Sequence, residues 1–381
     1  MLRVAYIDHT ARWSGGEVAL YNILTHLGSN VDPLVILAEE GVLADRLREQ
    51  GIQVRVITLN EKVRNRNRNV VNMQIVSAAF QLLSYGRRLA RILKEEQVVC
   101  VHTNSLKSAI YGAVAAKIAR IPLIWHIRDY IGEPYLKPVV AKAIRLMSRI
   151  LPNGIIANSN STLNALKLPK SKKTLVVYSS FANAINPASN VTVLKQKFTV
   201  LLVGRLAEWK GQHILLEAAK SFLPDQHVQF WLAGDALFGE DVYKEELLRQ
   251  IDVYGLTNVT LLGHVDNIQE LMQQADLLVH TSITPEPFGQ VIVEGMAAGL
   301  PVIASNEGGP TEIVVHGETG LLITPGDPAL LARSIRTLLA NPGERRRMSE
   351  NGMKRVQEHF VIERTVIQIT SYYEGLISNI N

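Results

Sequence analysis

Short apolar segments alternate with longer amphipathic ones along most of the chain. Residues 2–8, 32–38 and 98–104 are mainly apolar, and each precedes a stretch in which apolar residues recur three or four positions apart. Such alternation is typical of a parallel sheet with helices on both faces. It resumes at residue 198 after a polar interval. The pattern predicts an α/β chain of two doubly wound, Rossmann-like domains.

The polar interval sets the predicted domain boundary. Residues 181–196 lack a clear hydrophobic period, as expected of a linker. A chain of 381 residues is also too long for one ordinary core. We therefore expect an N-terminal domain over residues 1–180, a linker over 181–196 and a C-terminal domain over 197–364.

Composition narrows the class of protein. With 47% apolar residues and a mean hydropathy of +0.09, the chain is globular and not disordered. Its single cysteine, Cys100, excludes an intramolecular disulfide framework and a cysteine-rich zinc site. The start of the chain reads as a strand and not as a signal peptide, and no apolar stretch is long enough to span a membrane. We expect a cytoplasmic protein.

Charge is unevenly divided between the two halves. Residues 1–185 carry a net charge of +13 and residues 186–381 carry −8, which gives the overall +5. The asymmetry suggests that one half meets an anionic surface or substrate. A solvated surface with uneven charge explains the counts equally well.

Candidate chemistry lies just after predicted strands, where open α/β sheets bind their ligands. Arg205 and Lys210 follow the strand at 198–204 and precede a helix. Two cations beside a helix N-terminus suit a phosphate group, because Arg offers a fixed fork of donors and Lys a mobile point charge. Both could instead be solvated loop cations.

Two glutamates eight positions apart flank the start of an apolar helix. Glu286 precedes that start, so it either caps the helix or accepts hydrogen bonds from neutral hydroxyls such as those of a sugar. Glu294 interrupts the apolar sequence of the helix, and a buried carboxylate needs hydrogen-bonding partners. Ribose hydroxyls would serve.

The N-terminal half has its own strand-end residues. Gly15 and Gly16 allow close backbone approach to a ligand, although no GxGxxG or Walker A sequence is present. No DxD occurs, so a carboxylate-held magnesium has no evident site. His126 and Arg128 lie at the end of the predicted strand 122–128. A lone histidine is more often structural, but its place at a strand end favours function.

These motifs together resemble the retaining glycosyltransferases of family 4, which have the GT-B fold. The resemblance rests on E-x7-E (Glu286, Glu294), the following GGxxE (Gly308, Gly309, Glu312), a GRLxxxKG loop and an N-terminal GGE. It covers both halves of the chain, and the E-x7-E stretch is its most specific part. It implies that the last helix, residues 365–381, crosses back to the N-terminal domain.

The resemblance also implies roles for individual residues. Arg205 and Lys210 would bind the diphosphate of a nucleotide-sugar donor, Glu286 its sugar and Glu294 its ribose. His126 would lie near the sugar at the reacting centre, so the implied catalytic set is His126, Glu286, Arg205 and Lys210. The remaining implied donor contacts are Gly15 and Gly16 near the phosphate or sugar, the backbone near Val265 for the base, and Phe288, Gly289, Gln290 and Val291 around the helix start.

The expected activity is that of a retaining hexosyltransferase that needs no metal or other cofactor. The donor would be UDP-glucose or UDP-N-acetylglucosamine, with GDP-mannose behind. The acceptor would be a glycan or a lipid-linked saccharide in bacterial cell-envelope or exopolysaccharide synthesis. The leaving phosphate would help to deprotonate the acceptor.

Basic residues of the N-terminal half offer one candidate surface for the acceptor or for the inner face of the plasma membrane. The basic run 62–69 and a helix at 136–151 could lie against anionic lipid, or could be ordinary solvated faces. The cations concerned are Arg128, Lys137, Lys142, Arg145 and Arg149.

Two other functions fit parts of the sequence. A nucleotide-sugar 2-epimerase shares the GT-B architecture, but the "EPFG…E" stretch argues against it. A nucleic-acid-binding protein would explain the isoelectric point near 9.2, yet the basic stretches lack interleaved aromatic residues and any recognised nucleic-acid motif. We therefore expect no nucleic-acid partner.

Overall fold

The computed structural model describes residues 1–59, 75–182, 197–237 and 239–378. The predicted linker beyond residue 182 and the basic run 62–69 lie outside the described residues. The chain divides into two compact units. The N-terminal unit contains Met1–Ser180 and Ile362–Asn381, and the C-terminal unit contains Phe181–Val361.

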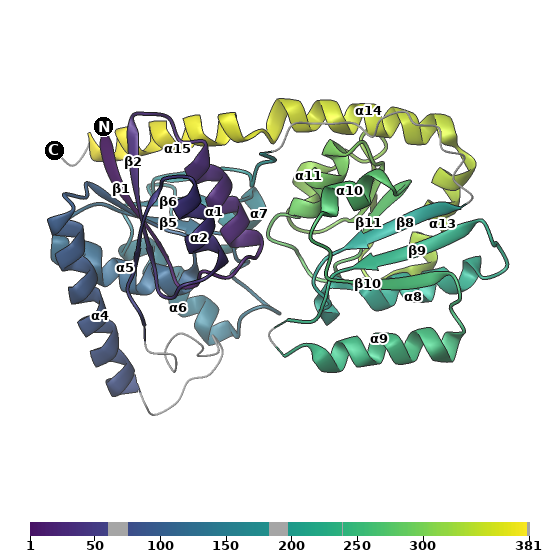
Figure 1. Cartoon of the computed structure of the whole chain (residues 1–381), viewed down its shortest axis with the longest axis horizontal. Coiled ribbons are helices and arrows are strands. Elements are labelled where there is room, and N and C mark those ends of the chain that lie inside the picture. The colour runs from purple at the N-terminus through teal and green to yellow at the C-terminus, as the bar shows by residue number, and fades with distance from the viewer. Residues whose placement is uncertain (60–74, 183–196, 238, 379–381) are drawn as a thin grey trace. The chain divides into compact units, whose positions relative to one another are not determined.

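The N-terminal unit is built on a parallel sheet of seven strands (Figure 1). Its strand order is β3-β2-β1-β4-β5-β6-β7, so the order reverses between the neighbours β1 and β4. The strands are β1 (Leu2–Asp8), β2 (Val31–Leu37), β3 (Gln53–Val56), β4 (Cys100–Thr103), β5 (Leu123–Ile127), β6 (Gly154–Ala157) and β7 (Thr174–Val176). The helices are α1 (Gly15–Thr25), α2 (Val42–Glu49), α4 (Ile75–Glu95), α5 (Leu106–Ala119), α6 (Pro138–Ile150), α7 (Asn160–Ala165) and α15 (Ile362–Ile377).

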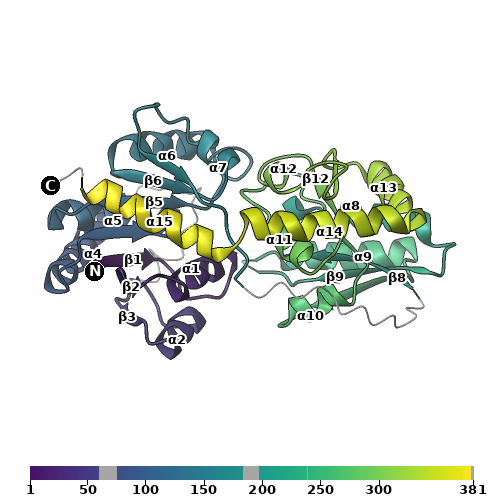
Figure 2. The ribbon, with the colours of Figure 1, turned by 90° about the horizontal axis from the view of Figure 1, so that it is seen from above.

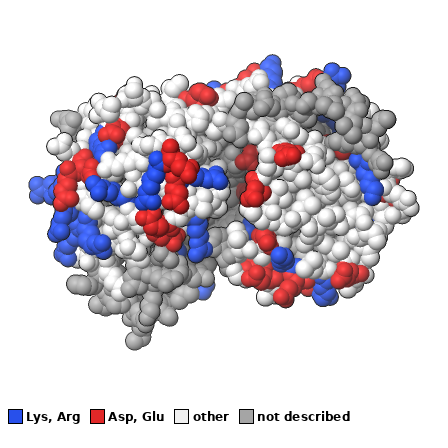
Figure 3. Space-filling model, viewed as in Figure 1, with Lys and Arg blue, Asp and Glu red and all other residues white. Residues whose placement is uncertain are grey.

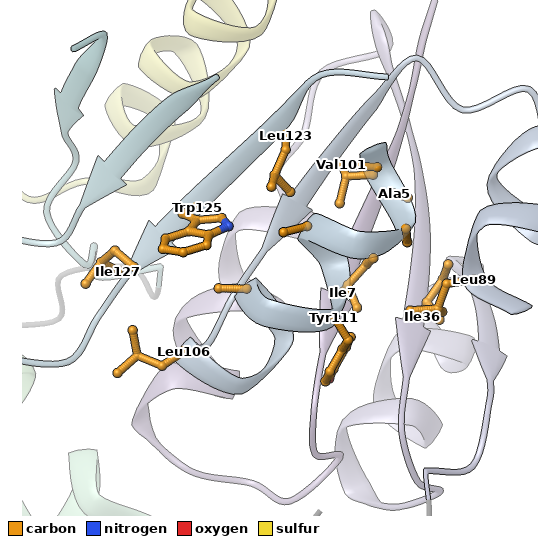
Figure 4. Close-up of a cluster of buried hydrophobic side chains, with 14 of the residues drawn as sticks. Ala5, Ile7, Ile36, Leu89, Val101, Leu106, Tyr111, Leu123, Trp125 and Ile127 are labelled. Carbon is orange, nitrogen blue, oxygen red and sulfur yellow. The ribbon is translucent and has the colours of Figure 1, made fainter. Parts of the chain in front are cut away.

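The two faces of this sheet differ in chemistry. One face packs against α5 through a buried apolar cluster that includes Ile7, Val101 and Trp125 (Figure 4). The opposite face is crossed by the terminal helix α15, which also contacts α1 (Figure 2). Because side chains alternate along a strand, the residues between the apolar ones face α15, and two of these are the buried His102 and His126.

The C-terminal unit repeats the plan with a parallel sheet of six strands in the order β10-β9-β8-β11-β12-β13. The strands are β8 (Phe198–Val203), β9 (Val228–Ala233), β10 (Val259–Gly263), β11 (Leu277–His280), β12 (Val302–Ser305) and β13 (Leu321–Ile323). The α-helices are α8 (Gln212–Ala219), α9 (Asp241–Tyr254), α10 (Ile268–Gln273), α11 (Gln290–Ala297), α12 (Pro310–Ile313), α13 (Pro328–Ala340) and α14 (Pro342–His359). Here the order reverses between β8 and β11.

Two parallel, doubly wound sheets confirm the predicted fold class. Each sheet has one reversal point, which is where doubly wound folds bind ligands at the carboxyl ends of the strands. In the described part of the chain, no helix is both long and apolar enough to cross a bilayer.

Candidate active site

A buried carboxylate forms the centre of the C-terminal site. Glu286 follows β11, and its Oε1 lies 2.6 Å from Lys210 Nζ. Its Oε2 lies 2.6 Å from His280 Nε2 and accepts a hydrogen bond of 2.7 Å from Ser282 Oγ. Burial alone would raise the pKa of Glu286, but the charges of Lys210 and His280 and their hydrogen bonds hold the pKa well below its usual range. Glu286 is therefore an ionised acceptor.

The loop that carries Lys210 is fastened to the loop after β11. Thr281 Oγ1 donates to the Lys210 carbonyl at 2.9 Å, and the Ile283 amide donates to the Trp209 carbonyl at 2.9 Å. Gly211 has φ +71°, and a Cβ there would lie 2.1 Å from the Thr281 carbonyl oxygen. Only glycine allows this approach, which explains the glycine of the GRLxxxKG loop.

The diglycine of the GGxxE motif fixes the backbone around Glu286. The Gly309 amide donates to the Glu286 carbonyl at 2.8 Å. Gly308 has φ +70°, and a Cβ there would lie 2.4 Å from the same carbonyl oxygen. A Cβ on Gly309 would lie 2.2 Å from the Phe288 carbonyl oxygen. Both glycines therefore serve close backbone packing against the segment that positions Glu286.

Arg205 lies after β8 but is paired with an acid that the sequence did not single out. Its Nε is 3.0 Å from Glu240 Oε2, and its guanidinium lies 5.8 Å from the centre of the Trp209 ring. Burial raises the pKa of Glu240, and the charge of Arg205 opposes that shift. Lys210 Nζ lies over the same Trp209 ring at 4.5 Å. Trp209 therefore packs beside both predicted phosphate ligands.

Helix α11 begins beside Glu286 and carries the second glutamate of the motif. Gly289, with φ +105°, is the N-cap of α11. As at any helix start, the first helical amides, here those of Gln290 and Val291, have no intrahelical partners. Glu294 is half-buried, and burial raises its pKa to about 7 against a hydrogen bond from Gln290. Val265 follows β10 and is half-buried too.

The N-terminal unit has a polar cluster at its own reversal point. Asp8 ends β1 and is fully buried, and it accepts hydrogen bonds from Asn104 Nδ2 at 2.7 Å and Ser105 Oγ at 2.9 Å. Arg128 Nε donates to Asn104 Oδ1 at 2.8 Å. A Cβ on Gly16 would lie 3.8 Å from Arg128 Cδ. The structure thus brings Arg128 and Gly16 together.

His126 lies in a buried series of polar rings on the α15 face of the sheet. Its Nδ1 is 3.0 Å from His102 Nε2, and His102 Nδ1 is 2.6 Å from the hydroxyl of Tyr373 on α15. Burial, followed by the charge of Arg128, lowers the pKa of His102 to about 3 and holds the pKa of His126 well below its usual value. Both imidazoles are neutral.

The cations of the helix at 136–151 are placed differently from one another. Lys137, Lys142 and Arg149 are exposed. Arg145 is half-buried and donates to the carbonyls of Ala165 and Ile131 at 2.8 and 2.6 Å. On the face in Figure 3, basic side chains over the N-terminal unit are interspersed with acidic ones. The described residues of the N-terminal unit therefore present no unbroken basic surface on this face.

Several site residues were not foreseen from the sequence. They are Asp8, His102, Asn104, Tyr373, Glu240, His280 and Ser282. For Asp8, His102 and His280 the available signal was a polar residue near the end of an otherwise apolar strand, a signal that Glu240 and Tyr373 do not have. Among the residues of the N-terminal unit, only His126 and Arg128 are predicted from this signal.

Two doubly wound units match the architecture of GT-B glycosyltransferases. Two family models match the chain: "Glycosyltransferase Family 4" over residues 42–178 and "Glycosyl transferases group 1" over residues 187–355. The chain belongs to the family 4 glycosyltransferases, as its motifs indicated.

Known relatives agree with this assignment. An uncharacterized glycosyltransferase of Methanocaldococcus jannaschii, MJ1607, is 31% identical over 197 residues, but the match spans 51% of this chain and 49% of that protein. The capsular polysaccharide biosynthesis glycosyltransferase CapM of Staphylococcus aureus is 25% identical across 87% of this chain and 92% of its own. Anabaena HepE, solved in complex with UDP-glucose, is 29% identical, with a TM-score of 0.84 over 98% of this chain and 100% of that chain.

Proposed function

We propose that the chain transfers a hexose from a nucleotide sugar to a glycan or lipid-linked acceptor in cell-envelope or exopolysaccharide synthesis. The observation that carries the proposal is the Lys210–Glu286 pair at the reversal point of the C-terminal sheet, beside the start of α11. UDP-glucose is our first choice of donor, because the structure of HepE, which is similar to this chain over nearly its whole length, was solved in complex with UDP-glucose. UDP-N-acetylglucosamine is the second choice.

The cations at this site suit the diphosphate of the donor. Lys210 Nζ has three N–H donors and uses one of them on Glu286, so the pair holds the ammonium in place while leaving donors for phosphate oxygens. Arg205 and the free amides at the start of α11 would add further hydrogen bonds. Together they would stabilise the charge that develops on the leaving nucleoside diphosphate without a metal ion.

The two glutamates suit the hydroxyls of the donor. Glu286 is ionised and anchored, and its remaining lone pair would accept from a sugar hydroxyl. Glu294, one turn into α11, would accept from the ribose, and His126 of the N-terminal unit would contact the sugar. We propose reaction with retention, in which the leaving phosphate helps to deprotonate the acceptor.

Isothermal titration in EDTA tests the donor site. We expect one of UDP, GDP and ADP to bind well above the others, and the matching sugar nucleotide to release that diphosphate on turnover. Arg205→Ala and Glu294→Ala should each weaken binding. Exposed Arg346, in the C-terminal unit, supplies the control variant Arg346→Ala. Equal binding by all variants, or binding only when Mg²⁺ is restored, would contradict the metal-free site.

We also propose that α6 places the protein at the inner face of an anionic membrane, where lipid-linked acceptors lie. Three apolar side chains of α6, Val139, Leu146 and Ile150, are 74%, 56% and 69% exposed. Lys142 and Arg149 are exposed on the same helix. An exposed apolar stripe with flanking cations suits an interface of anionic lipid. Arg145 is left out of this surface because it is half-buried and its guanidinium donates to two backbone carbonyls, whereas Arg149 remains exposed while it donates to the Lys167 carbonyl.

Vesicle sedimentation tests this placement. We expect binding to vesicles that contain phosphatidylglycerol, little binding to phosphatidylcholine alone, and loss of binding in Leu146→Gln/Ile150→Gln. The matched control is Val242→Gln/Val253→Gln on α9, where the side chains are 77% and 67% exposed. Equal loss in both double variants, or binding that ignores lipid charge, would reject α6 as the docking surface.

A further inference from the structure

The terminal helix α15 is joined to His126 through a buried series of hydrogen-bonding groups. The Tyr373 hydroxyl lies 3.0 Å from the Tyr6 hydroxyl of β1 and 2.6 Å from His102 Nδ1 of β4. His102 Nε2 then lies 3.0 Å from His126 Nδ1 of β5. Tyr6, His102, Tyr373 and His126 are each no more than 1% exposed. All four residues belong to the N-terminal unit.

Arg128 determines which way the hydrogen bonds point. Its Nη2 lies 3.4 Å from His126 Nδ1, the same atom that faces His102. A guanidinium carries only donors, so His126 Nδ1 is the group that accepts. His102 must then donate from Nε2 and accept at Nδ1. The Tyr373 hydroxyl, which donates to the Tyr6 hydroxyl in the structure, would turn its proton to His102 Nδ1 and accept from Tyr6 instead. A neutral His126 that accepts at Nδ1 carries its proton on Nε2.

The Nε2–H group of His126 has no partner within the described residues, although it is buried. A buried donor without a partner costs free energy, and such groups concentrate at functional sites. Its partner is therefore an acceptor from outside the described residues, such as a ligand oxygen or a water molecule. The hydroxyl or ring oxygens of a sugar are such acceptors.

We propose that His102 and Tyr373 are positioning residues that hold His126 as the neutral Nε2–H tautomer, so that it donates to an oxygen of the donor sugar. The part that concerns the sugar rests on the proposed function. A neutral donor suits this place because a sugar ring becomes positively charged as its glycosidic bond breaks. An imidazolium there would oppose that charge, and the opposite tautomer could not donate from Nε2.

Histidine tautomers can be read in the ligand-free protein. Two-bond ¹H–¹⁵N spectra of ¹⁵N-histidine-labelled protein distinguish Nε2–H from Nδ1–H, and His126→Asn assigns the His126 signals by their loss. We expect neutral Nε2–H for His126 between pH 6 and 8. In His102→Leu we expect a mixture of tautomers, whereas His102→Gln, whose amide can donate to Nδ1, should keep Nε2–H. Nδ1–H in the wild type, or an unchanged spectrum in His102→Leu, would overturn the proposal.

Turnover gives the second measurement. We expect His102→Leu to lower kcat roughly tenfold to a hundredfold with little change in KM, because His126 would no longer be held in the tautomer that acts in the transition state. His102→Gln should recover most of the lost kcat. Tyr373→Phe removes a single hydroxyl and should lower kcat by less, which keeps the test available if His102→Leu fails to fold. If kcat is unchanged in His102→Leu and Tyr373→Phe, their positioning role is wrong. If His126→Asn turns over normally while the tautomers behave as expected, the role of His126 in the reaction is wrong instead.

Discussion

Lys210 and the buried Glu286 form a partly buried ion pair, with Nζ 2.6 Å from Oε1, although 76 positions separate them in the chain. The pair joins the loop after β8 to the loop after β11. It therefore couples the proposed phosphate ligand to the proposed sugar ligand, and a change in one residue should affect both substrate binding and folding.

We expect Lys210→Ala to lower kcat by about 10²–10³, as when one donor to a developing negative charge is removed. It should also lower the free energy of unfolding of the C-terminal unit by roughly 3 kcal/mol, because Glu286 stays buried without its cation. Release of the nucleoside diphosphate and urea unfolding measure the two effects. Adding Glu286→Gln should restore much of the stability but none of the turnover. Stability that stays low in the double variant would show that the ion pair is not the cause.

Gly308 offers a test of the backbone that holds Glu286. Gly308→Ala should abolish measurable donor binding, because its Cβ would lie 2.4 Å from the Glu286 carbonyl oxygen. Gly317 is the matched control, since its φ is +76° against +70° and its Cβ would meet nothing within 4 Å. Gly317→Ala should cost only about 1 kcal/mol of left-handed backbone strain. Titration with the sugar nucleotide compares donor binding by the two variants. An equal loss of affinity in Gly308→Ala and Gly317→Ala would mean that the positive φ, and not the clash with the Glu286 carbonyl, causes the loss.

The fold was readable from the sequence because parallel strands are buried on both faces. Segments such as 2–8 and 198–204 are short and apolar, and helices with a clear period separate them. In the structure the terminal helix begins at Ile362, which is buried in the N-terminal unit and continues the apolar face of α15.

Residues of the site could be predicted from the sequence only where they belong to a local motif. The E-x7-E spacing and the GRLxxxKG loop indicated Glu286 and Lys210 as separate ligands, but not their contact. That contact depends on β8 and β11 being neighbours, which is a property of strand order. Tyr373 was out of reach for the same reason, since only the return of α15 brings it 2.6 Å from His102.

Glu294 should make donor binding depend on pH. Burial raises its pKa to about 7, so it is only about one-tenth ionised at pH 6, and only the carboxylate accepts from both ribose hydroxyls. We expect UDP-glucose to bind roughly tenfold more weakly at pH 6 than at pH 8. A sugar nucleotide is used because its diphosphate does not titrate in this range. Glu294→Gln should bind weakly at both pH values, and a slope that persists in this variant would point to another group.

His102 should make the N-terminal unit less stable in acid. Its folded pKa is lowered to about 3, so below about pH 6.5 the unfolded chain takes up a proton that the folded chain does not. The stability that His102 contributes is thus full above pH 6.5 and falls as pH decreases. Burial and Asp8 raise the pKa of Glu17 to about 7, which acts in the opposite sense.

The comparison of wild type with His102→Gln cancels the contribution of Glu17, which both proteins contain. Between pH 6 and pH 5 we expect the wild type to lose about 1.4 kcal/mol more than the variant, the value for one proton per pH unit. Urea unfolding followed by the fluorescence of Trp125, with the other tryptophans replaced by phenylalanine, reports on the N-terminal unit. Parallel pH profiles would mean that His102 is protonated in the folded state.

Glu240 should weaken the donor site by holding Arg205. The two side chains are 25% and 29% exposed, and Arg205 Nε lies 3.0 Å from Glu240 Oε2. Glu240→Gln removes this competing carboxylate, so we expect UDP to bind more tightly by about 1 kcal/mol, or roughly fivefold. The control is Glu245→Gln, an exposed position of α9 that changes the net charge equally. UDP titration at low and high salt distinguishes release of Arg205 from a general effect of net charge. A general charge effect would tighten binding in both variants and would vanish at high salt, whereas release of Arg205 would tighten binding in Glu240→Gln alone and would persist at high salt.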